Sequence, residues 1–232
     1  MNCILFERTG KIAHIRLNRP DVMNAFSVQM LNEFNEALES FRTDGTLHVA
    51  IISGEGGRAF STGRDLKDKT APRPGLNISD AEYCDKPMIA AIRGYCIGQG
   101  LGVAVSCDLR VASTDAVFSL PEVPHGMVLT GLGALVVRTI GLQAALEFSL
   151  LGEKKDAVWA LNAGLVHRLV EPGTELAVAE TMAERLAGMD LSAMRVSKRA
   201  LYKAAEASYK ELLAFSEPLR QQVLDAKKSS HS

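Results

Sequence analysis

Hydrophobic and polar positions alternate along two short runs near the start of the chain, residues 3–7 and 12–17. An alternation with a period of two is typical of a strand that buries one face. The Thr9-Gly10 pair between the runs is typical of a tight turn, because glycine accepts backbone angles that other residues avoid. These residues therefore predict a β-hairpin.

From Ser27 onwards the apolar positions recur every three or four residues, which is the spacing of one helix face. Ser27 stands where a hydroxyl can accept a hydrogen bond from the free N–H groups of a first helical turn. We expect an amphipathic helix that packs on a sheet through six residues, namely Met30, Leu31, Phe34, Ala37, Leu38 and Phe41.

Further along, short and almost continuously apolar segments are typical of buried strands. They are residues 48–54, 88–94, and 109–112 with 116–118. The first two end in glycine and lead into glycine-rich loops, and after the second loop we expect a helix that runs to about Cys107. This recurrence of strand, loop and helix predicts an α/β fold built as a spiral of ββα turns.

The last third of the chain is predicted to be mostly helical. Helical spacing covers residues 131–140, 143–151, 155–163, 174–188 and 191–224, with a short extended piece at 164–170. No linker rich in serine, glycine or proline separates this part from the strands. We therefore expect one domain, with a spiral core in residues 1–190 and a helical oligomerisation segment in residues 191–232.

Composition and charge narrow the classes of function. The 232 residues are 47% hydrophobic and 23% charged, with a formal net charge of -1, so electrostatics favours neither nucleic acid nor an anionic membrane as partner. The first twenty residues contain no apolar run long enough for a signal peptide or a membrane span, and we expect a cytoplasmic protein. Four dispersed cysteines and five histidines without metal-ligand spacing predict reduced thiols and no metal site.

Three segments, residues 59–68, 90–108 and 118–126, follow one another in an order and spacing that closely resemble the crotonase, or enoyl-CoA hydratase/isomerase, superfamily. Residues 17–27 before them and 161–170 after them extend the resemblance over most of the chain. It implies the α/β crotonase (ClpP-like) spiral with a helical C-terminal part. It also implies an acyl-CoA thioester as substrate, no other tightly bound cofactor, and a homotrimer or dimer of trimers.

The resemblance further implies that two backbone N–H groups, those of Arg64 and Gln99, bind the thioester oxygen. Enolate formation places negative charge on that oxygen, and each preorganised donor in a dry site is worth ~3 kcal/mol. Gln99 is expected to begin a helix, whose dipole adds to the field at the same oxygen. The family usually has glycine here, so the glutamine side chain is a departure that leaves the N–H intact.

Coenzyme A is implied to run along residues 59–66, largely against backbone. The candidate contacts are Ser61, Gly63, Asp65, Leu66 and Gly98. Lys67 and Arg19 are candidates for the phosphates. Asp65 has a second interpretation, because an aspartate after a glycine turn often caps the following helix.

The acid–base residues determine which reaction is expected. Hydratases of this family hold a water between two glutamates, whereas this chain has Gly102 at the first position and Glu122 at the second. A lone carboxylate can move a proton but is poorly equipped to activate water. The leading hypothesis is an enoyl-CoA isomerase, in which Glu122 takes a proton from C2 of a 3-enoyl-CoA and returns it to C4. Desolvation is expected to raise the pKa of Glu122 for this purpose.

Several alternatives stay open. They are a hydratase with a second acid or base elsewhere, a hydrolase or decarboxylase with the same oxyanion site, and a weakly catalytic acyl-CoA-binding protein. His125 is either a second proton carrier or a bystander. The segment between Asp65 and Pro87 is shorter than in the family, and the usual aromatic and basic C-terminal ending is missing, so the acyl specificity does not transfer.

Overall fold

A computed structural model describes residues 2–71, 75–76, 84–129 and 131–205, together with 218, 221, 222 and 225. The strands are β1 (Ile4–Thr9), β2 (Ile12–Leu17), β3 (Val49–Gly54), β4 (Ala59–Ser61), β5 (Met88–Ile92), β6 (Tyr95–Ile97), β7 (Leu109–Ser113), β8 (Val117–Ser119), β9 (Lys155–Asp156) and β10 (Arg168–Val170). The helices are η1 (Pro20–Val22), α1 (Val28–Thr43), α2 (Gln99–Ser106), η2 (Val123–His125), α3 (Gly131–Leu151), α4 (Ala157–Asn162), α5 (Glu175–Ala187) and α6 (Leu191–Ala204).

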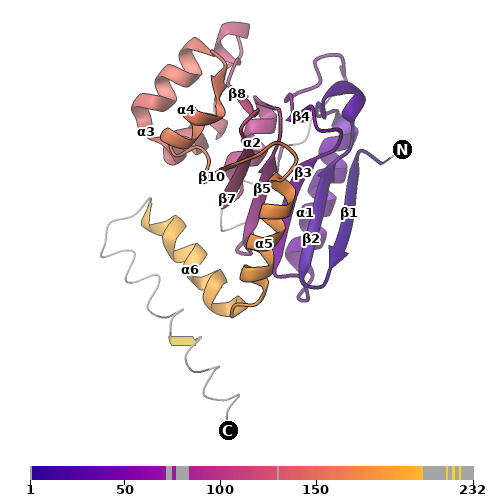
Figure 1. The fold of residues 1–232 in the computed structure, drawn as a ribbon, viewed down its shortest axis with the longest axis vertical. Coiled ribbons are helices and arrows are strands. Elements are labelled where there is room, and N and C mark those ends of the chain that lie inside the picture. Colours follow the sequence, from indigo (N-terminus) through magenta and orange to yellow (C-terminus); the bar gives the residue numbers. More distant parts are fainter. Residues whose placement is uncertain are drawn as a thin grey trace.

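The strands form two sheets, and the chain passes repeatedly from one to the other. The larger sheet has the order β1-β2-β3-β5-β7-β10 and the smaller one the order β4-β6-β8-β9. Thus β3 leads to β4, β5 to β6 and α2, and β7 to β8, η2 and α3 (Figure 1). The predicted spiral of ββα turns is confirmed in this order of elements.

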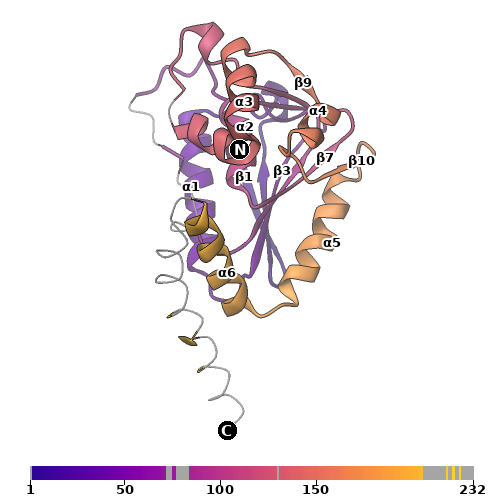
Figure 2. The same cartoon turned by 90° about the vertical axis from the view of Figure 1, so that its left-hand side faces the viewer.

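Both faces of the larger sheet are covered, which explains why its strands are almost continuously apolar. Figure 2 shows the sheet nearly edge-on, with α1 and α5 on opposite sides. On β3, for example, Ala50 and Ile52 belong to the core that contains the α1 side chains, whereas Val49 and Ile51 pack with Ala179 and Ala183 of α5.

Helix α1 forms as its pattern predicts. The Ser27 hydroxyl accepts a hydrogen bond from Met30 N–H at 3.2 Å, and the six predicted apolar residues are the buried ones. A second cap comes from a distant segment, because an Asp68 carboxylate oxygen accepts from Val28 N–H at 2.7 Å. The start of α1 is thereby tied to the loop that follows β4.

The last third differs from the prediction in two places. The helices expected at 131–140 and 143–151 are joined in α3, which breaks at Gly141, where φ is 77° and ψ is 163°. The helix expected at 155–163 begins only at Ala157, because Asp156 accepts from Trp159 N–H at 2.7 Å and caps it. Most of the helix expected beyond residue 205 lies outside the described residues, as does much of the short segment before Pro87.

The Asp108 carboxylate links helix α6 to strand β5. The Asp108 carboxylate accepts from Met88 N–H at 2.7 Å, from Lys198 Nζ at 2.8 Å and from the Tyr202 hydroxyl at 3.1 Å. Burial, followed by the nearby Asp108 carboxylate, raises the pKa of Tyr202. Asp108 is therefore structural.

Candidate active site

A cavity of about 1510 Å³ lies between the loops after β4 and β6, the η2 turn and helix α3. Most of its wall is apolar, with Leu129, Leu132 and Leu135 from the α3 side. An apolar cavity with a few polar groups is the usual form of a small-molecule site. The polar groups come from the two glycine loops, from Glu122 and His125 at the η2 turn, and from Ser106 of α2 and Arg138 of α3.

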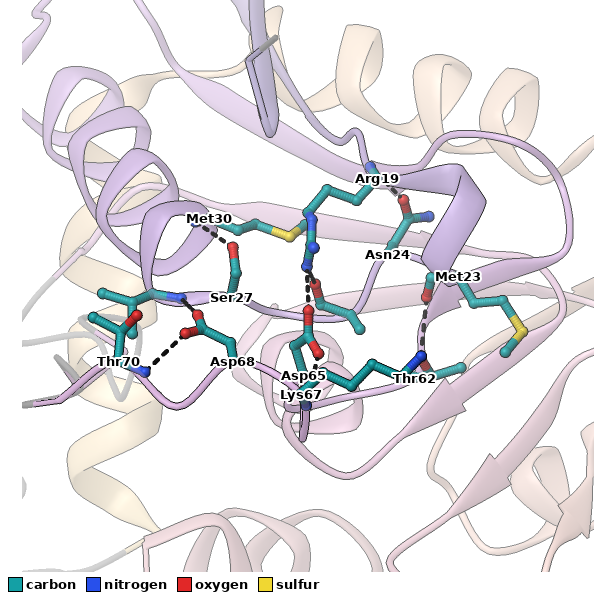
Figure 3. A network of polar contacts seen from close by, with 12 residues as sticks. Arg19, Met23, Asn24, Ser27, Met30, Thr62, Asp65, Lys67, Asp68 and Thr70 are labelled. Atoms are coloured by element: carbon teal, nitrogen blue, oxygen red, sulfur yellow. Dashed lines mark hydrogen bonds and ion pairs between the residues drawn. The ribbon is translucent and has the colours of Figure 1, made fainter.

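The loop after β4 is held by the segment before α1, as Figure 3 shows. The Asn24 amide oxygen accepts from Arg19 N–H at 2.9 Å, and its amide nitrogen donates to the carbonyls of Ala59 at 2.9 Å and Glu55 at 3.0 Å. Thr62 N–H donates to the Met23 carbonyl at 3.1 Å. Sequence reasoning missed Asn24, although asparagine near a proline turn is a known signal for the left-handed φ of 54° that it adopts.

Two further hydrogen bonds orient Arg64. Phe26 N–H donates to the Gly63 carbonyl at 2.7 Å, and the Phe26 carbonyl accepts from Asp65 N–H at 3.0 Å. Arg64 lies between these two partners of Phe26 in a parallel bridge, and its own N–H therefore points away from Phe26. Arg64 lines the cavity, and its N–H has no acceptor among the described residues.

The second loop meets the first at Gly63. A Cβ at this position would lie 2.8 Å from the Ile97 carbonyl oxygen and 3.2 Å from Gln99 N, and φ of Gly63 is +87°. Only glycine lets the two backbones approach this closely. Gln99 is the first residue of α2, so its N–H is one of the donors that a helix leaves free. The structure thus brings the Arg64 and Gln99 N–H groups to one part of the cavity.

Glu122 reaches the same place from the position just before the η2 turn. One carboxylate oxygen, Oε1, lies 2.9 Å from the position of a Cβ on Gly98, next to Gln99. The other, Oε2, is buried and has no hydrogen-bond partner among the described residues. Burial raises the pKa of this carboxyl, and a backbone hydrogen bond and the neighbouring His125 act in the opposite direction.

Gly102 also lines the cavity, but it faces apolar atoms. A Cβ on Gly102 would lie 3.3 Å from Cδ1 of Leu132 on α3. Among the described lining residues, Glu122 is the only carboxylate. Sequence reasoning missed Leu132, because the helix pattern of α3 carries no signal for which residue comes to face α2.

The candidate coenzyme A contacts divide into two groups. Gly63, Leu66 and Gly98 line the cavity. Ser61 has no exposed surface, and its hydroxyl donates to the Asn24 carbonyl at 2.8 Å and accepts from Gly63 N–H at 3.1 Å. Its role is corrected accordingly: it holds the glycine loop and presents nothing to a ligand.

Asp65 also differs from expectation. Its carboxylate pairs with Arg19 at 3.0 Å and accepts from Lys67 N–H at 3.1 Å (Figure 3). No helix follows it in the described residues up to 71, so the prediction of a helix cap is wrong. The Arg19 hydrogen bond helps to lower the pKa of Asp65, against the effect of burial. These three residues border a separate, smaller cavity of about 720 Å³.

Comparison with known proteins adds independent information. Residues 7–232 match the family model described as enoyl-CoA hydratase/isomerase. The chain is 36% identical over 208 residues to (E)-benzylidenesuccinyl-CoA hydratase of Thauera aromatica, covering 85% of this chain and 81% of that one. It is 29% identical over 227 residues to short-chain-enoyl-CoA hydratase of Clostridium acetobutylicum, covering 93% and 87%. A solved structure of enoyl-CoA hydratase from Mycobacterium tuberculosis H37Rv superposes with a TM-score of 0.89 at 31% identity, covering 99% and 94%.

The close approach at Gly63 leads to a first prediction. Gly63→Ala should lower turnover of a thioester substrate by about 10²- to 10³-fold, the usual effect of losing an oxyanion donor, because the two loops are forced apart. Steady-state kinetics measure this. Gly10→Ala is the matched control, since Gly10 has a φ of +57° but no atom within 4 Å of the added Cβ. Equal losses in both variants would contradict the assignment.

The burial of Glu122 leads to a second prediction. A carboxyl whose pKa is raised by folding binds its proton more tightly in the native state, so the native state loses stability as pH rises through that pKa. Glutamine stays neutral at every pH. The melting temperature of Glu122→Gln relative to that of the wild type should therefore rise as the pH increases above about 4.3, the ordinary pKa of glutamate. A difference that does not grow with pH would contradict this account.

Proposed function

The chain belongs to the enoyl-CoA hydratase/isomerase, or crotonase, family, and on that premise we propose that it moves a double bond of an enoyl-CoA from C3 to C2. The observation that carries this proposal is that the described lining residues include one carboxylate, Glu122, while the wall at Gly102 and Leu132 is apolar. Hydration needs one group to activate water and a second to protonate carbon. A proton shuttle needs only one.

The first step creates the enolate. Glu122 takes a proton from C2, and the electrons of the broken C–H bond move onto the thioester oxygen. The Arg64 and Gln99 N–H groups donate to that oxygen, each contributing ~3 kcal/mol in a dry site. Because Gln99 begins α2, the positive end of the helix dipole acts on the same charge.

The second step moves the double bond. The enolate formed from a 3-enoyl-CoA is a dienolate, with negative charge shared between the oxygen, C2 and C4. Protonated Glu122 returns its proton to C4, and the double bond is left between C2 and C3. The desolvation that raises the pKa of Glu122 supports both roles, because it strengthens the base and keeps the acid form populated nearer neutral pH.

Hydratase activity is the second candidate, and the names of the similar proteins favour it. The relatives from Thauera aromatica and Clostridium acetobutylicum are both named as hydratases. In this chain, hydration would require an acid or base other than a carboxylate at position 102. Comparing the two reactions on the same preparation discriminates between the candidates.

We therefore expect the wild type to isomerise a 3-enoyl-CoA faster than it hydrates crotonyl-CoA. Glu122→Gln should lower isomerisation by about 10²- to 10⁴-fold, the usual contribution of general acid–base catalysis. Absorbance of the conjugated 2-enoyl thioester follows both reactions. Hydration that is faster than isomerisation and that is abolished by Glu122→Gln would overturn the isomerase proposal.

The apolar wall suggests a gain-of-function variant. Gly102→Glu introduces a second carboxylate, and Leu132→Ala removes the two methyl groups that lie 3.3 Å and 3.8 Å from the new Cβ. The double variant should hydrate crotonyl-CoA at least about tenfold faster than Leu132→Ala alone, because water then has two acid–base partners. Equal hydration rates in the two variants would show that the missing carboxylate does not limit hydration.

We also propose that copies of the chain associate as a trimer or a dimer of trimers. Leu142, Leu146 and Leu150, spaced by four residues on α3, are exposed, as are Val158 and Leu161 of α4. Among the described helices, only α3 also has the length and apolar composition of a membrane span, but its backbone breaks at Gly141. A second copy would cover this surface. Sedimentation equilibrium tests the proposal, and a monomer at micromolar concentration would contradict it.

A further inference from the structure

Exchange of the Glu122 proton with water requires a route from the carboxyl to solvent, and one of the two carboxylate oxygens is buried. Its Oε2 is buried without a hydrogen-bond partner among the described residues, and its Oε1 lies 2.9 Å from where a Cβ on Gly98 would be. Isomerisation can proceed without such a route, because the same proton leaves C2 and arrives at C4. Any reaction that exchanges the proton with water requires one.

His125 lies in position to supply that route. Glu122 is the residue just before η2 and His125 is the last residue of that turn, and His125 N–H donates to the Glu122 carbonyl at 3.1 Å. This hydrogen bond between residues three apart is that of a 3-10 turn, in which such side chains lie one above the other. Glu122 and His125 both line the cavity, but the His125 residue is exposed. The acidic group inside the cavity and the imidazole open to solvent are therefore neighbours on one wall.

A hydrogen bond determines which ring nitrogen of His125 can carry a moving proton. Nδ1 lies 2.6 Å from the Pro121 carbonyl oxygen, which accepts and cannot donate, so we assign a hydrogen to Nδ1. In the neutral ring, Nε2 then carries the free lone pair. In the charged ring, Nε2 carries the second hydrogen. Nε2 can thus gain and lose a proton while the Nδ1 hydrogen bond stays in place.

The other ionisable lining residues do not offer this chemistry. Among the described residues around the cavity, they are Arg64 and Arg138. A guanidinium keeps its protons at every pH at which proteins are active. Histidine changes its charge near neutral pH and is the usual proton shuttle in proteins.

We propose that His125 is a proton relay that exchanges the proton of Glu122 with water. The Glu122 carboxyl gives its proton to Nε2 of neutral His125, directly or through one water, which leaves a carboxylate and an imidazolium. The imidazolium then passes its Nε2 proton to solvent, and the reverse sequence reloads Glu122. No other reactant is needed. The inference rests on the proposed role of Glu122 as the base at C2.

Two reactions at the same site distinguish the role of His125 as a relay from the role of Glu122 as the base. Exchange of the C2 hydrogens of butyryl-CoA in deuterium oxide requires Glu122 to release its proton to solvent while the ligand is bound. Isomerisation of a 3-enoyl-CoA requires transfer only between two carbons of the ligand. Loss of a relay should therefore affect the first reaction far more than the second.

The experiment measures both rates, by proton NMR and by absorbance, in the wild type, His125→Gln, His125→Ala and Glu122→Gln. We expect exchange to fall by about 10²-fold or more in both His125 variants, a loss typical of a missing proton-transfer group, and isomerisation to fall by less than about tenfold. Added imidazole should restore exchange in His125→Ala but not in Glu122→Gln. His14→Gln is the control for loss of an imidazole outside the cavity, since His14 lies on β2.

Equal losses in both reactions, unchanged exchange in the His125 variants, or absence of exchange in the wild type would each overturn the relay. A different outcome would contradict the proposed isomerase function. A wild type that exchanges the C2 hydrogens through Glu122 and His125 but does not isomerise would contradict the isomerase and support the relay.

Discussion

The close approach of two backbone segments at Gly63 is the contact on which the rest of the site depends. With no side chain at this position, the loop after β4 can lie against the start of α2, and the N–H groups of Arg64 and Gln99 come to one part of the cavity. The smaller sheet serves this contact, because β4 and β6 are paired immediately before the two loops begin. The Asn24 and Phe26 hydrogen bonds then hold the first loop in place.

The cavity contains polar groups that have no hydrogen-bond partner among the described residues. Two backbone donors have no acceptor among the described residues, and one buried carboxylate oxygen has no donor. Leaving a buried polar group such as Glu122 Oε2 unsatisfied costs about 1–3 kcal/mol in the folded state. Such a cost persists only where the surrounding structure leaves no alternative arrangement. A ligand with a carbonyl oxygen next to an acidic C–H matches these groups, because its oxygen can accept from the two backbone N–H groups and its C–H can face the carboxylate.

Local features of this protein could be predicted well, and contacts between distant segments could not. The α1 stripe and its Ser27 cap depend on residues within one or two turns, as do the apolar strands and the glycine loops. The burial of Ser61, the pairing of Asp65 with Arg19 and the approach of Leu132 to Gly102 depend on how separate elements pack. The spacing of residues along the chain does not indicate which elements pack together, and the family resemblance did not predict these three features.

The most direct test of the central claim is a crystal structure with a bound acyl-CoA. The account predicts that the thioester oxygen lies about 2.7–3.1 Å from both Arg64 N and Gln99 N, the distance range of productive oxyanion donors. It also predicts that the Glu122 carboxylate faces C2 and C4 of the acyl group. A thioester oxygen bound elsewhere in the cavity, with either N–H left without an acceptor, would contradict the account.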